Sequence, residues 1–297
     1  MFEGIIRAVF TARFRKANAH YSTEETIGQR GSIPRSGKEP VEVIFYYPEK
    51  RENAPVVVQI HGGAWVGMDA VDDDGYCVRL SKELGAFVVN VNYKRLYERP
   101  FPYQQEEAVD TVKWLLANAA KLGIDKRKII ITGGSAGGHI TAGTAIMLAQ
   151  EGISIAGQVL EVPFLDFTHK LAINSPKTEK LYDLMLKIYA NKLPREHEVV
   201  SPVAAQDEIL KKVAAASIIV CGRDPLQPHG EYYAQRLNSL GIPAALKLYE
   251  NGYHGFGTDK DEEKAEQDAL REDCFWYKVE EIKRLYRLSE EENHGKA

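Results

Sequence analysis

A serine flanked by glycines, at residues 133–137 (G-G-S-A-G), is the clearest sign of chemistry in the chain. An apolar run at 128–132 precedes it, and an alanine- and threonine-rich stretch with a helical pattern follows it. In such a strand-to-helix turn the glycines relieve crowding around the serine, and the hydroxyl projects from the turn. The helix amino terminus also offers free N–H groups to an oxyanion. The motif predicts Ser135 as a nucleophile, with an ordinary tight turn as the alternative.

A serine hydroxyl needs a base to remove its proton, so this prediction requires a histidine and an acid elsewhere in the chain. Asp224 closely follows an apolar run at 217–221, and His254 follows another at 245–249. Both therefore lie past the carboxyl end of a predicted strand, as Ser135 does, and we expect all three at one edge of a sheet. Taken singly, Asp224 would be a turn aspartate before proline, and His254 a loop histidine. The nearest rival acids are Glu161 and Asp166.

Acyl transfer passes through a tetrahedral oxyanion, which requires preorganised hydrogen-bond donors beside the nucleophile. The sequence H-G-G-A-W at 61–65 directly follows the apolar run at 55–60. Its adjacent glycines allow two backbone N–H groups to turn toward one point without obstruction by side chains. We expect the N–H groups of Gly62, Gly63 and Ala136 to form an oxyanion hole. The alternative is a glycine-rich turn without a catalytic role.

The elements that must position these residues alternate between short β-branched runs and longer helical patterns. Several runs lack period-two alternation, as expected for parallel strands covered by helices on both faces. The pattern predicts an α/β fold with a mostly parallel, doubly wound sheet. The predicted strands are residues 41–47, 55–60, 86–93, 128–132, 155–162, 217–221 and 245–249. The predicted helices are residues 74–84, 104–122, 136–150, 230–240 and 261–288.

Residues 167–200 interrupt this alternation with a helical pattern that no strand separates from the residues after it. We interpret them as an insertion that would cover the site as a lid, because ligands bind beyond the carboxyl ends of the strands in such sheets. Residues 2–16 predict a helix packed on the rest of the protein, with a membrane-surface helix or a transit segment as alternatives. We expect one domain spanning residues 1–297, with cap elements at about 1–40 and 167–200.

The composition is that of an ordinary globular chain, with 297 residues, 44% hydrophobic and 27% charged. No uninterrupted apolar stretch reaches about 18 residues, so we expect no stable insertion into a membrane. The formal charge of −4 argues against nucleic acid or an anionic bilayer as a partner and leaves a small molecule. The distant cysteines Cys77, Cys221 and Cys274 favour a reducing, cytoplasmic compartment. Nothing in the sequence indicates an oligomeric state.

Other residues carry weaker signals. The sequence Asp72–Gly75 lacks the alternating ligand spacing of a calcium loop, and we interpret it as a solvated loop. The histidines show no paired spacing, so we expect no metal site. Five aromatic residues either line an acyl or alcohol pocket or belong to the core: Trp65, Phe164, Phe167, Tyr182 and Tyr189.

Taken together, these motifs resemble those of the hormone-sensitive-lipase-like esterases of the α/β-hydrolase superfamily. The resemblance extends from about residue 41 to residue 257. Two departures bear on the subfamily: Gly134 stands where many relatives carry an acidic residue, and Ala64 where they carry a third glycine. The matching stretches are residues 61–63, 92–96, 100–102, 133–138, 201–202, 224–226, 233–237 and 254–256.

The resemblance implies an α/β-hydrolase fold with a helical cap and a lipase-like serine carboxylesterase without metal or organic cofactor. It also implies hydrolysis of short- to medium-chain esters through an acyl-enzyme. Ser135 would attack the ester, His254 would transfer the proton, and Asp224 would orient the imidazole. The H-G-G-x-W motif is also similar to that of kynurenine formamidases, which keeps an amide or formamide hydrolase open. A non-catalytic ligand-binding relative is the remaining alternative.

Overall fold

A central sheet of eight strands organises the part of the chain that the computed structural model describes, which is residues 2–168, 170–171, 180, 183–184, 187, 193–255 and 265–294. The strand order is β1-β2-β4-β3-β5-β6-β7-β8. The pairs β1–β2 and β2–β4 are antiparallel, and all later pairs are parallel. The strands are β1 (Gln29–Ile33), β2 (Val41–Tyr46), β3 (Ala54–Ile60), β4 (Phe87–Asn92), β5 (Ile124–Gly134), β6 (Gly157–Glu161), β7 (Ala216–Cys221) and β8 (Ala244–Tyr249).

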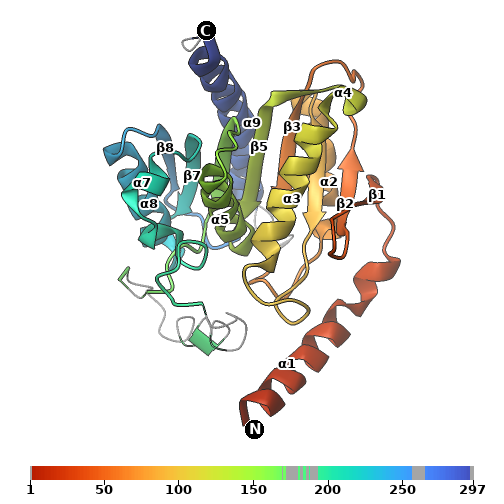
Figure 1. Cartoon of the computed structure of the whole chain (residues 1–297). Coiled ribbons are helices and arrows are strands. Elements are labelled where there is room, and N and C mark those ends of the chain that lie inside the picture. The colour runs from red at the N-terminus through yellow and green to blue at the C-terminus, as the bar shows by residue number, and fades with distance from the viewer. Residues whose placement is uncertain are drawn as a thin grey trace.

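Helices cover both faces of this sheet (Figure 1). The helices α2 (Asp74–Leu84) and α9 (Ala265–His294) pack on one face, and α3 (Tyr103–Ala117), α5 (Ala136–Gln150) and α8 (Gln227–Ser239) pack on the other. The remaining described helical elements are α1 (Phe2–Asn18), η1 (Ala19–Thr23), η2 (Ala70–Asp73), α4 (Ala119–Leu122), η3 (Pro202–Ala204) and α7 (Asp207–Leu210).

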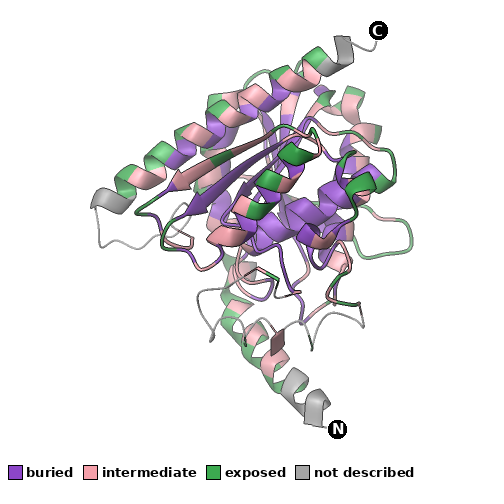
Figure 2. Ribbon diagram, turned by 90° about the vertical axis from the view of Figure 1, so that its left-hand side faces the viewer, coloured by how far each residue is buried: buried purple, intermediate pink, exposed green. Residues whose placement is uncertain are grey.

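The innermost layer consists of the central strands and α5, which are buried almost throughout (Figure 2). In the register of β3 with β5, Val57 lies beside Ile130 and Val58 beside Ile131. Neighbouring residues of one strand point to opposite faces, so both faces need apolar side chains here. Because these strands are buried on both faces, their sequences are continuous apolar runs.

The predicted α/β-hydrolase fold with a mostly parallel sheet is confirmed, and the seven predicted strands all occur, with some shifted ends. The edge strand β1 was not predicted. The predicted helix at 104–122 divides into α3 and α4 at Asn118, whose backbone caps one helix and begins the next. The predicted insertion at 167–200 lies partly outside the described residues, so its role as a cap stays a prediction.

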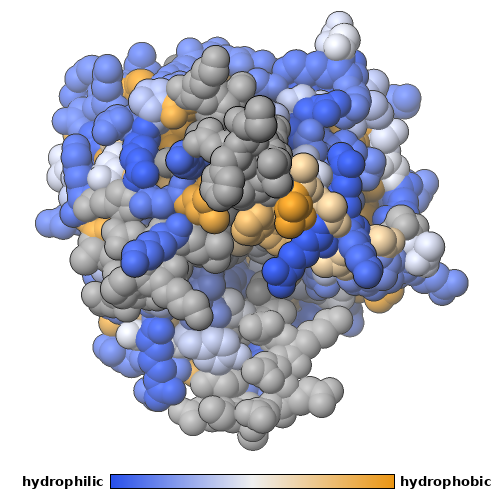
Figure 3. All heavy atoms as spheres, turned by 90° about the horizontal axis from the view of Figure 1, so that it is seen from below, coloured by the Kyte–Doolittle hydropathy of each residue, from blue (hydrophilic) through white to orange (hydrophobic). Residues whose placement is uncertain are grey.

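Helix α1 projects from the body of the molecule (Figures 1 and 2). Its last turn is tied down: Asn18 Nδ2 donates to the Val66 carbonyl at 2.8 Å and contacts the Tyr97 hydroxyl at 3.0 Å, and Phe14 stacks on the Tyr97 ring. On the face seen from below, hydrophobic residues gather near the middle, with hydrophilic residues beside them (Figure 3). Within the described ranges, no helix combines the length and apolarity that a bilayer crossing requires.

The three cysteines lie in different layers, Cys77 in α2, Cys221 at the end of β7 and Cys274 in α9. All three are buried, and all three are free thiols. Burial raises the pKa of the Cys274 thiol to about 12, so it stays protonated at neutral pH.

Candidate active site

Ser135 occupies a sharp turn between β5 and α5. Its backbone has φ 54° and ψ −115°, a conformation that L-residues rarely adopt. Its N–H donates to the Glu161 carbonyl at 2.8 Å, which fixes the turn to the end of β6. A Cβ atom at Gly137 would lie 2.1 Å from the Ile60 carbonyl oxygen, so only glycine allows the helix to start this close to β3. The strained turn therefore depends on the backbones of three neighbouring strands.

The side chains of Ser135, His254 and Asp224 form one hydrogen-bonded chain. The Ser135 hydroxyl lies 2.8 Å from His254 Nε2, and His254 Nδ1 lies 3.0 Å from Asp224 Oδ2. The Asp224 carboxylate is fully buried, whereas about a third of the imidazole surface is exposed. The second carboxylate oxygen accepts the Leu226 N–H at 2.9 Å, which fixes the orientation of Asp224. Each residue follows a different parallel strand, β5, β7 or β8.

Backbone hydrogen bonds tie the loop carrying the acid to the loop carrying the histidine. The Gly222 N–H donates to the Tyr249 carbonyl and the Arg223 N–H to the Gly252 carbonyl, each at 3.0 Å. A Cβ at Gly222 would lie 2.4 Å from the Glu250 carbonyl oxygen, so the close approach of the two loops requires glycine. The separation of Asp224 and His254 is thus fixed by main-chain contacts.

The rival acids have other partners. Glu161 Oε2 accepts from Lys278 Nζ at 2.7 Å. Asp166 accepts hydrogen bonds from the N–H groups of Thr168 and Leu171 and from the Thr168 hydroxyl, and so closes a local turn. Asp224 is therefore the carboxylate that contacts the imidazole.

The loop after β3 approaches the serine closely. A Cβ at Gly62 would lie 3.3 Å from the Gly134 carbonyl oxygen and 3.8 Å from Ser135 Cβ. The Tyr93 hydroxyl donates to the Gly62 carbonyl at 2.8 Å. In a trans peptide the N–H points opposite to the preceding C=O, so the Gly63 N–H points away from the buried Tyr93. Gly62 and Gly63 line the same cavity as Ser135, and Ala136 begins α5 directly after it.

Backbone strain is concentrated in this loop and must be held in place. Ala64, Trp65 and Met68 all have positive φ. At Gly63, with φ 95°, a Cβ would lie 2.2 Å from the Gly67 carbonyl oxygen, so no other residue fits there. Ala64, which stands where relatives carry a third glycine, accepts φ 51° with a side chain present.

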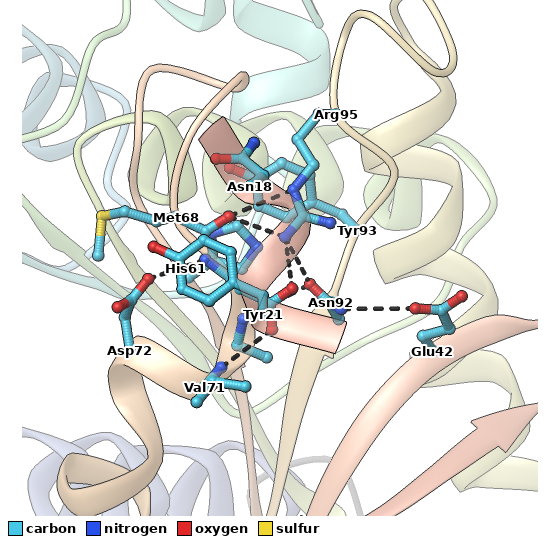
Figure 4. Close-up of polar contacts among 12 residues, drawn as sticks. Asn18, Tyr21, Glu42, His61, Met68, Val71, Asp72, Asn92, Tyr93 and Arg95 are labelled. Carbon is cyan, nitrogen blue, oxygen red and sulfur yellow. Dashed lines mark hydrogen bonds and ion pairs between the residues drawn. The ribbon is translucent and has the colours of Figure 1, made fainter. Parts of the chain in front are cut away.

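Arg95 and His61 brace the loop from behind (Figure 4). The Arg95 guanidinium donates to the Met68 carbonyl at 2.8 Å and pairs with Asp69 at 2.6 Å. The His61 ring stacks on Tyr93 at 4.1 Å between centroids, and its Nδ1 lies 3.0 Å from the Gly62 carbonyl. Burial, reinforced by the Arg95 charge, lowers the pKa of His61 to about 3, so this ring is neutral. The sequence motifs included these residues but gave no sign of this bracing role.

A cavity of about 300 Å³ opens onto the serine. It is lined by loop, elbow and histidine residues together with three polar side chains that no motif indicated: Gln59, Gly62, Gly63, Ala64, Met68, Asp73, Gly134, Ser135, Glu161, Val162, His254 and Gly255.

Of the two interpretations of the aromatic residues, the core one holds for Trp65, Phe164 and Phe167. Each is 1% exposed, and none lines the described part of the cavity. They pack edge-on or tilted against one another and around the buried His139, whose Nδ1 accepts the Trp65 indole N–H at 3.1 Å. Tyr182 and Tyr189 lie outside the described residues.

The interpretation of Asp72–Gly75 as a solvated loop is wrong. Asp73 is 2% exposed, and Asp74 accepts hydrogen bonds from the Ile27 and Gly28 N–H groups and the Tyr46 hydroxyl. The carboxylates begin α2 where β2 and β3 pass close by, which the sequence alone does not reveal. Among the residues that the structure covers, no group of three or more potential ligands is arranged to hold a metal ion.

Comparisons with known proteins give a consistent result. The model of a family described as having the alpha/beta hydrolase fold matches residues 57–258. An arylesterase from Saccharolobus solfataricus is 32% identical over 221 residues, which cover 71% of each chain. A carboxylesterase, NlhH, from Mycobacterium tuberculosis is 29% identical over 248 residues, covering 78% of this chain and 74% of that protein.

Solved structures agree with these relatives. A bacterial heroin esterase superposes with a TM-score of 0.80 at 26% identity, covering 93% of both chains. A hyperthermophilic esterase from the archaeon Pyrobaculum calidifontis superposes with a TM-score of 0.76 at 29% identity, covering 95% of this chain and 93% of the other. With the strained serine turn and the sheet order, these matches show that the chain belongs to the α/β-hydrolase family, among its hormone-sensitive-lipase-like esterases.

Proposed function

We propose that the protein is a serine carboxylesterase that hydrolyses short- to medium-chain esters through an acyl-enzyme. The observation that carries this proposal is the hydrogen-bonded chain from the Ser135 hydroxyl through His254 to Asp224, with distances of 2.8 and 3.0 Å. The relatives reported above are named as esterases, and none of them is named as an amide or formamide hydrolase. The formamidase alternative therefore has no support from them.

The proposed mechanism has two halves. In the first, Ser135 Oγ attacks the ester carbonyl while His254 Nε2 takes the hydroxyl proton, and the tetrahedral intermediate collapses as His254 returns that proton to the leaving alcohol. In the second, His254 deprotonates a water molecule that attacks the acyl carbonyl, and the new tetrahedral intermediate collapses as His254 returns the proton to Ser135 Oγ and the acid leaves. Asp224 accepts from Nδ1 throughout, which fixes the imidazole tautomer and stabilises the imidazolium.

Backbone donors stabilise the oxyanion in this proposal. The N–H groups of Gly62, Gly63 and Ala136 supply them, supported by the approach of the loop to Ser135 and by the Tyr93 hydrogen bond that turns the Gly63 N–H away from Tyr93. The cavity of about 300 Å³ is at the small end of ligand pockets, which span about 300–1,000 Å³. A small ester fits this described part of the cavity.

Replacement of the nucleophile tests this function. We expect Ser135→Ala to lower kcat for p-nitrophenyl butanoate by several orders of magnitude, as loss of a triad serine does. A fluorophosphonate probe should label the wild-type protein and fail to label the variant. Unchanged turnover in Ser135→Ala would overturn the nucleophile assignment. Failure of the probe to label folded wild-type protein would favour the non-catalytic alternative.

Two further predictions from the sequence, the cap elements and the cytoplasmic compartment, remain proposals. The cap element at about 1–40 is supported by the position of α1 against the loop after β3, through the hydrogen bond from Asn18 to the Val66 carbonyl, whereas the cap element at about 167–200 is proposed from the sequence alone. The cytoplasmic compartment is supported by the free, buried state of Cys77, Cys221 and Cys274.

A further inference from the structure

Part of the active-site cavity is lined by three polar side chains that the hydrolytic machinery does not use, those of Gln59, Asp73 and Glu161. They come from β3, η2 and β6. Each is at most 4% exposed, so each has lost most of its contact with water. Such groups are costly to bury unless hydrogen bonds replace the lost water. The hydrogen bonds and charges of these three side chains therefore indicate which groups a bound molecule would have to supply.

The Gln59 carboxamide has a fixed orientation with its oxygen left over. Its Nε2 donates to Asp73 Oδ2 at 2.8 Å. A carboxylate can only accept, so the amide nitrogen must face Asp73 and the position of the oxygen is determined. Gln59 Oε1 is buried and has no hydrogen-bond partner among the described residues. A donor on a bound molecule would satisfy it.

Asp73 and Glu161 carry two formal negative charges, and Lys278 beside them leaves a net charge of minus one. Glu161 is paired with Lys278, whose Nζ lies 2.7 Å from Glu161 Oε2 and 4.4 Å from the centre of the Tyr76 ring. The described lining of the cavity does not include Lys278. The Lys278 charge also acts on Asp73, but among the described contacts its ion pair is with Glu161, so one cation serves two carboxylates. Burial raises the pKa of Asp73 to about 6, and the carboxylate is still mostly ionised above neutral pH.

Gly134 has no side chain to fill the space in the cavity between Ser135 and the polar side chains of Asp73 and Glu161. Its backbone does not require glycine, because it is absent from the described positions of positive φ. A Cβ there would meet only the Glu161 carbonyl oxygen, at 3.9 Å. Gly134, Ser135, Asp73 and Glu161 all line the same cavity, so the space that a side chain at 134 would fill belongs to it.

We propose that Gln59, Asp73 and Glu161 form a subsite for a protonated amine carried by the ester substrate. The inference rests on the esterase function proposed above and names its substrate class. An ammonium group supplies both the positive charge and the N–H donors that the subsite lacks. An alkyl group would leave the buried acceptors unpaired, and an anionic group would be repelled.

Matched esters test the subsite on both sides of the scissile bond. On the alcohol side, 2-(dimethylamino)ethyl acetate is compared with its neutral isostere, 3-methylbutyl acetate. On the acyl side, methyl 4-(dimethylamino)butanoate is compared with methyl 5-methylhexanoate. The readout is the ratio of kcat/KM for amine and isostere, measured by pH-stat titration at pH 7.5. We expect the ratio to exceed about tenfold in at least one pair, as the loss of a hydrogen bond to a charged group does.

Substitutions locate the preference. Asp73→Asn keeps the shape and the hydrogen bond from Gln59 but removes the charge, and should lower the ratio by about tenfold. Asp72→Asn is the matched control, because it removes the same charge one residue away, outside the described cavity lining, and should leave the ratio unchanged. Gly134→Val places a side chain in the open space and leaves Asp73 itself unchanged, and should also lower the ratio.

The outcomes separate this inference from the esterase proposal. If neutral and amine esters are hydrolysed equally well in both pairs, the subsite assignment is overturned while the esterase function stands. An equal fall of the ratio in Asp72→Asn and Asp73→Asn would also overturn it, because a diffuse field would then be responsible. If 2-(trimethylammonio)ethyl acetate, a cation without an N–H group, matches the tertiary amine, the donor role of the substrate is wrong. Absence of hydrolysis of every ester would instead contradict the proposed function.

Discussion

At the scale of single residues, the side chains of the proposed triad could be predicted, whereas the polar side chains that shape the cavity could not. Ser135, Asp224 and His254 are each marked by a strand followed by a loop, and parallel strands bring such loops to one edge of the sheet. Gln59 and Asp73 carry no local signal. Their contact depends on how η2 packs against β3, which no spacing in the sequence encodes.

The raised pKa of Asp73 predicts a pH dependence of the protein's stability. Its pKa of about 6 lies above the ordinary value of 3.8, so the folded state binds a proton more tightly than the unfolded state does. Asp73 therefore lowers the free energy of unfolding as the pH rises from about 4 through 6, by up to about 3 kcal/mol. Burial is the main cause; Asp72 and Glu161 add to it, and Gln59 and Lys278 oppose it.

We therefore expect Asp73→Asn to gain stability relative to the wild-type protein as pH rises from 4 to 7. The measurement is urea denaturation at each pH. A stability difference between the two proteins that is the same at pH 4 and pH 7 would contradict the raised pKa.

At the scale of elements, seven of the eight strands were predictable because they are apolar, and all of these except the edge strand β8 are mostly buried. The unpredicted strand, β1, has the sequence QRGSI and is largely exposed. It is held by its antiparallel register with β2 and not by its own hydrophobic pattern. The break between α3 and α4 was missed for a related reason, since the apolar spacing continues across Asn118 and only the backbone records the interruption.

The loop between β4 and α3 positions the loop after β3, and Tyr93→Phe tests this. The substitution removes the hydrogen bond to the Gly62 carbonyl and leaves the stacking on His61 in place. We expect kcat for p-nitrophenyl butanoate to fall about tenfold with little change in KM, because the orientation of the Gly63 N–H, the proposed oxyanion donor, matters chiefly in the transition state.

A variant in which KM rises and kcat is unchanged would contradict this positioning role. Thermal unfolding of the same variant measures the loss of stability that removal of the hydroxyl causes, and we expect the free energy of unfolding to fall by about 1 kcal/mol.

At the scale of the whole molecule, the long carboxyl-terminal helix α9 packs across the central strands of the sheet. Its apolar residues pack on β3, β5 and β6, and the Tyr286 hydroxyl donates to the Val56 carbonyl at 2.9 Å. Lys278 and Glu161 form an ion pair across this interface with both side chains at most 5% exposed. The helix was predictable, but this buried pair was not, because its two members are 117 residues apart.

Breaking this pair should be costly. We expect Lys278→Ala to lower the free energy of unfolding by about 3–5 kcal/mol, because it leaves the Glu161 carboxylate buried without its cation. Lys283→Ala on the same helix breaks an exposed pair with Glu280 and should cost less than about 1 kcal/mol. Urea denaturation of both variants measures the difference, and equal losses would show that Glu161 is not stabilised by Lys278.

The acid and histidine loops are held together by main-chain atoms, through Gly222 with Tyr249 and Arg223 with Gly252. Amide and carbonyl groups are common to all residues except for the missing N–H of proline, so exchange of a side chain at the exposed Arg223 leaves these links in place. This position therefore offers protein engineers a place to change the surface next to Asp224 while the contact between the acid and the histidine is retained.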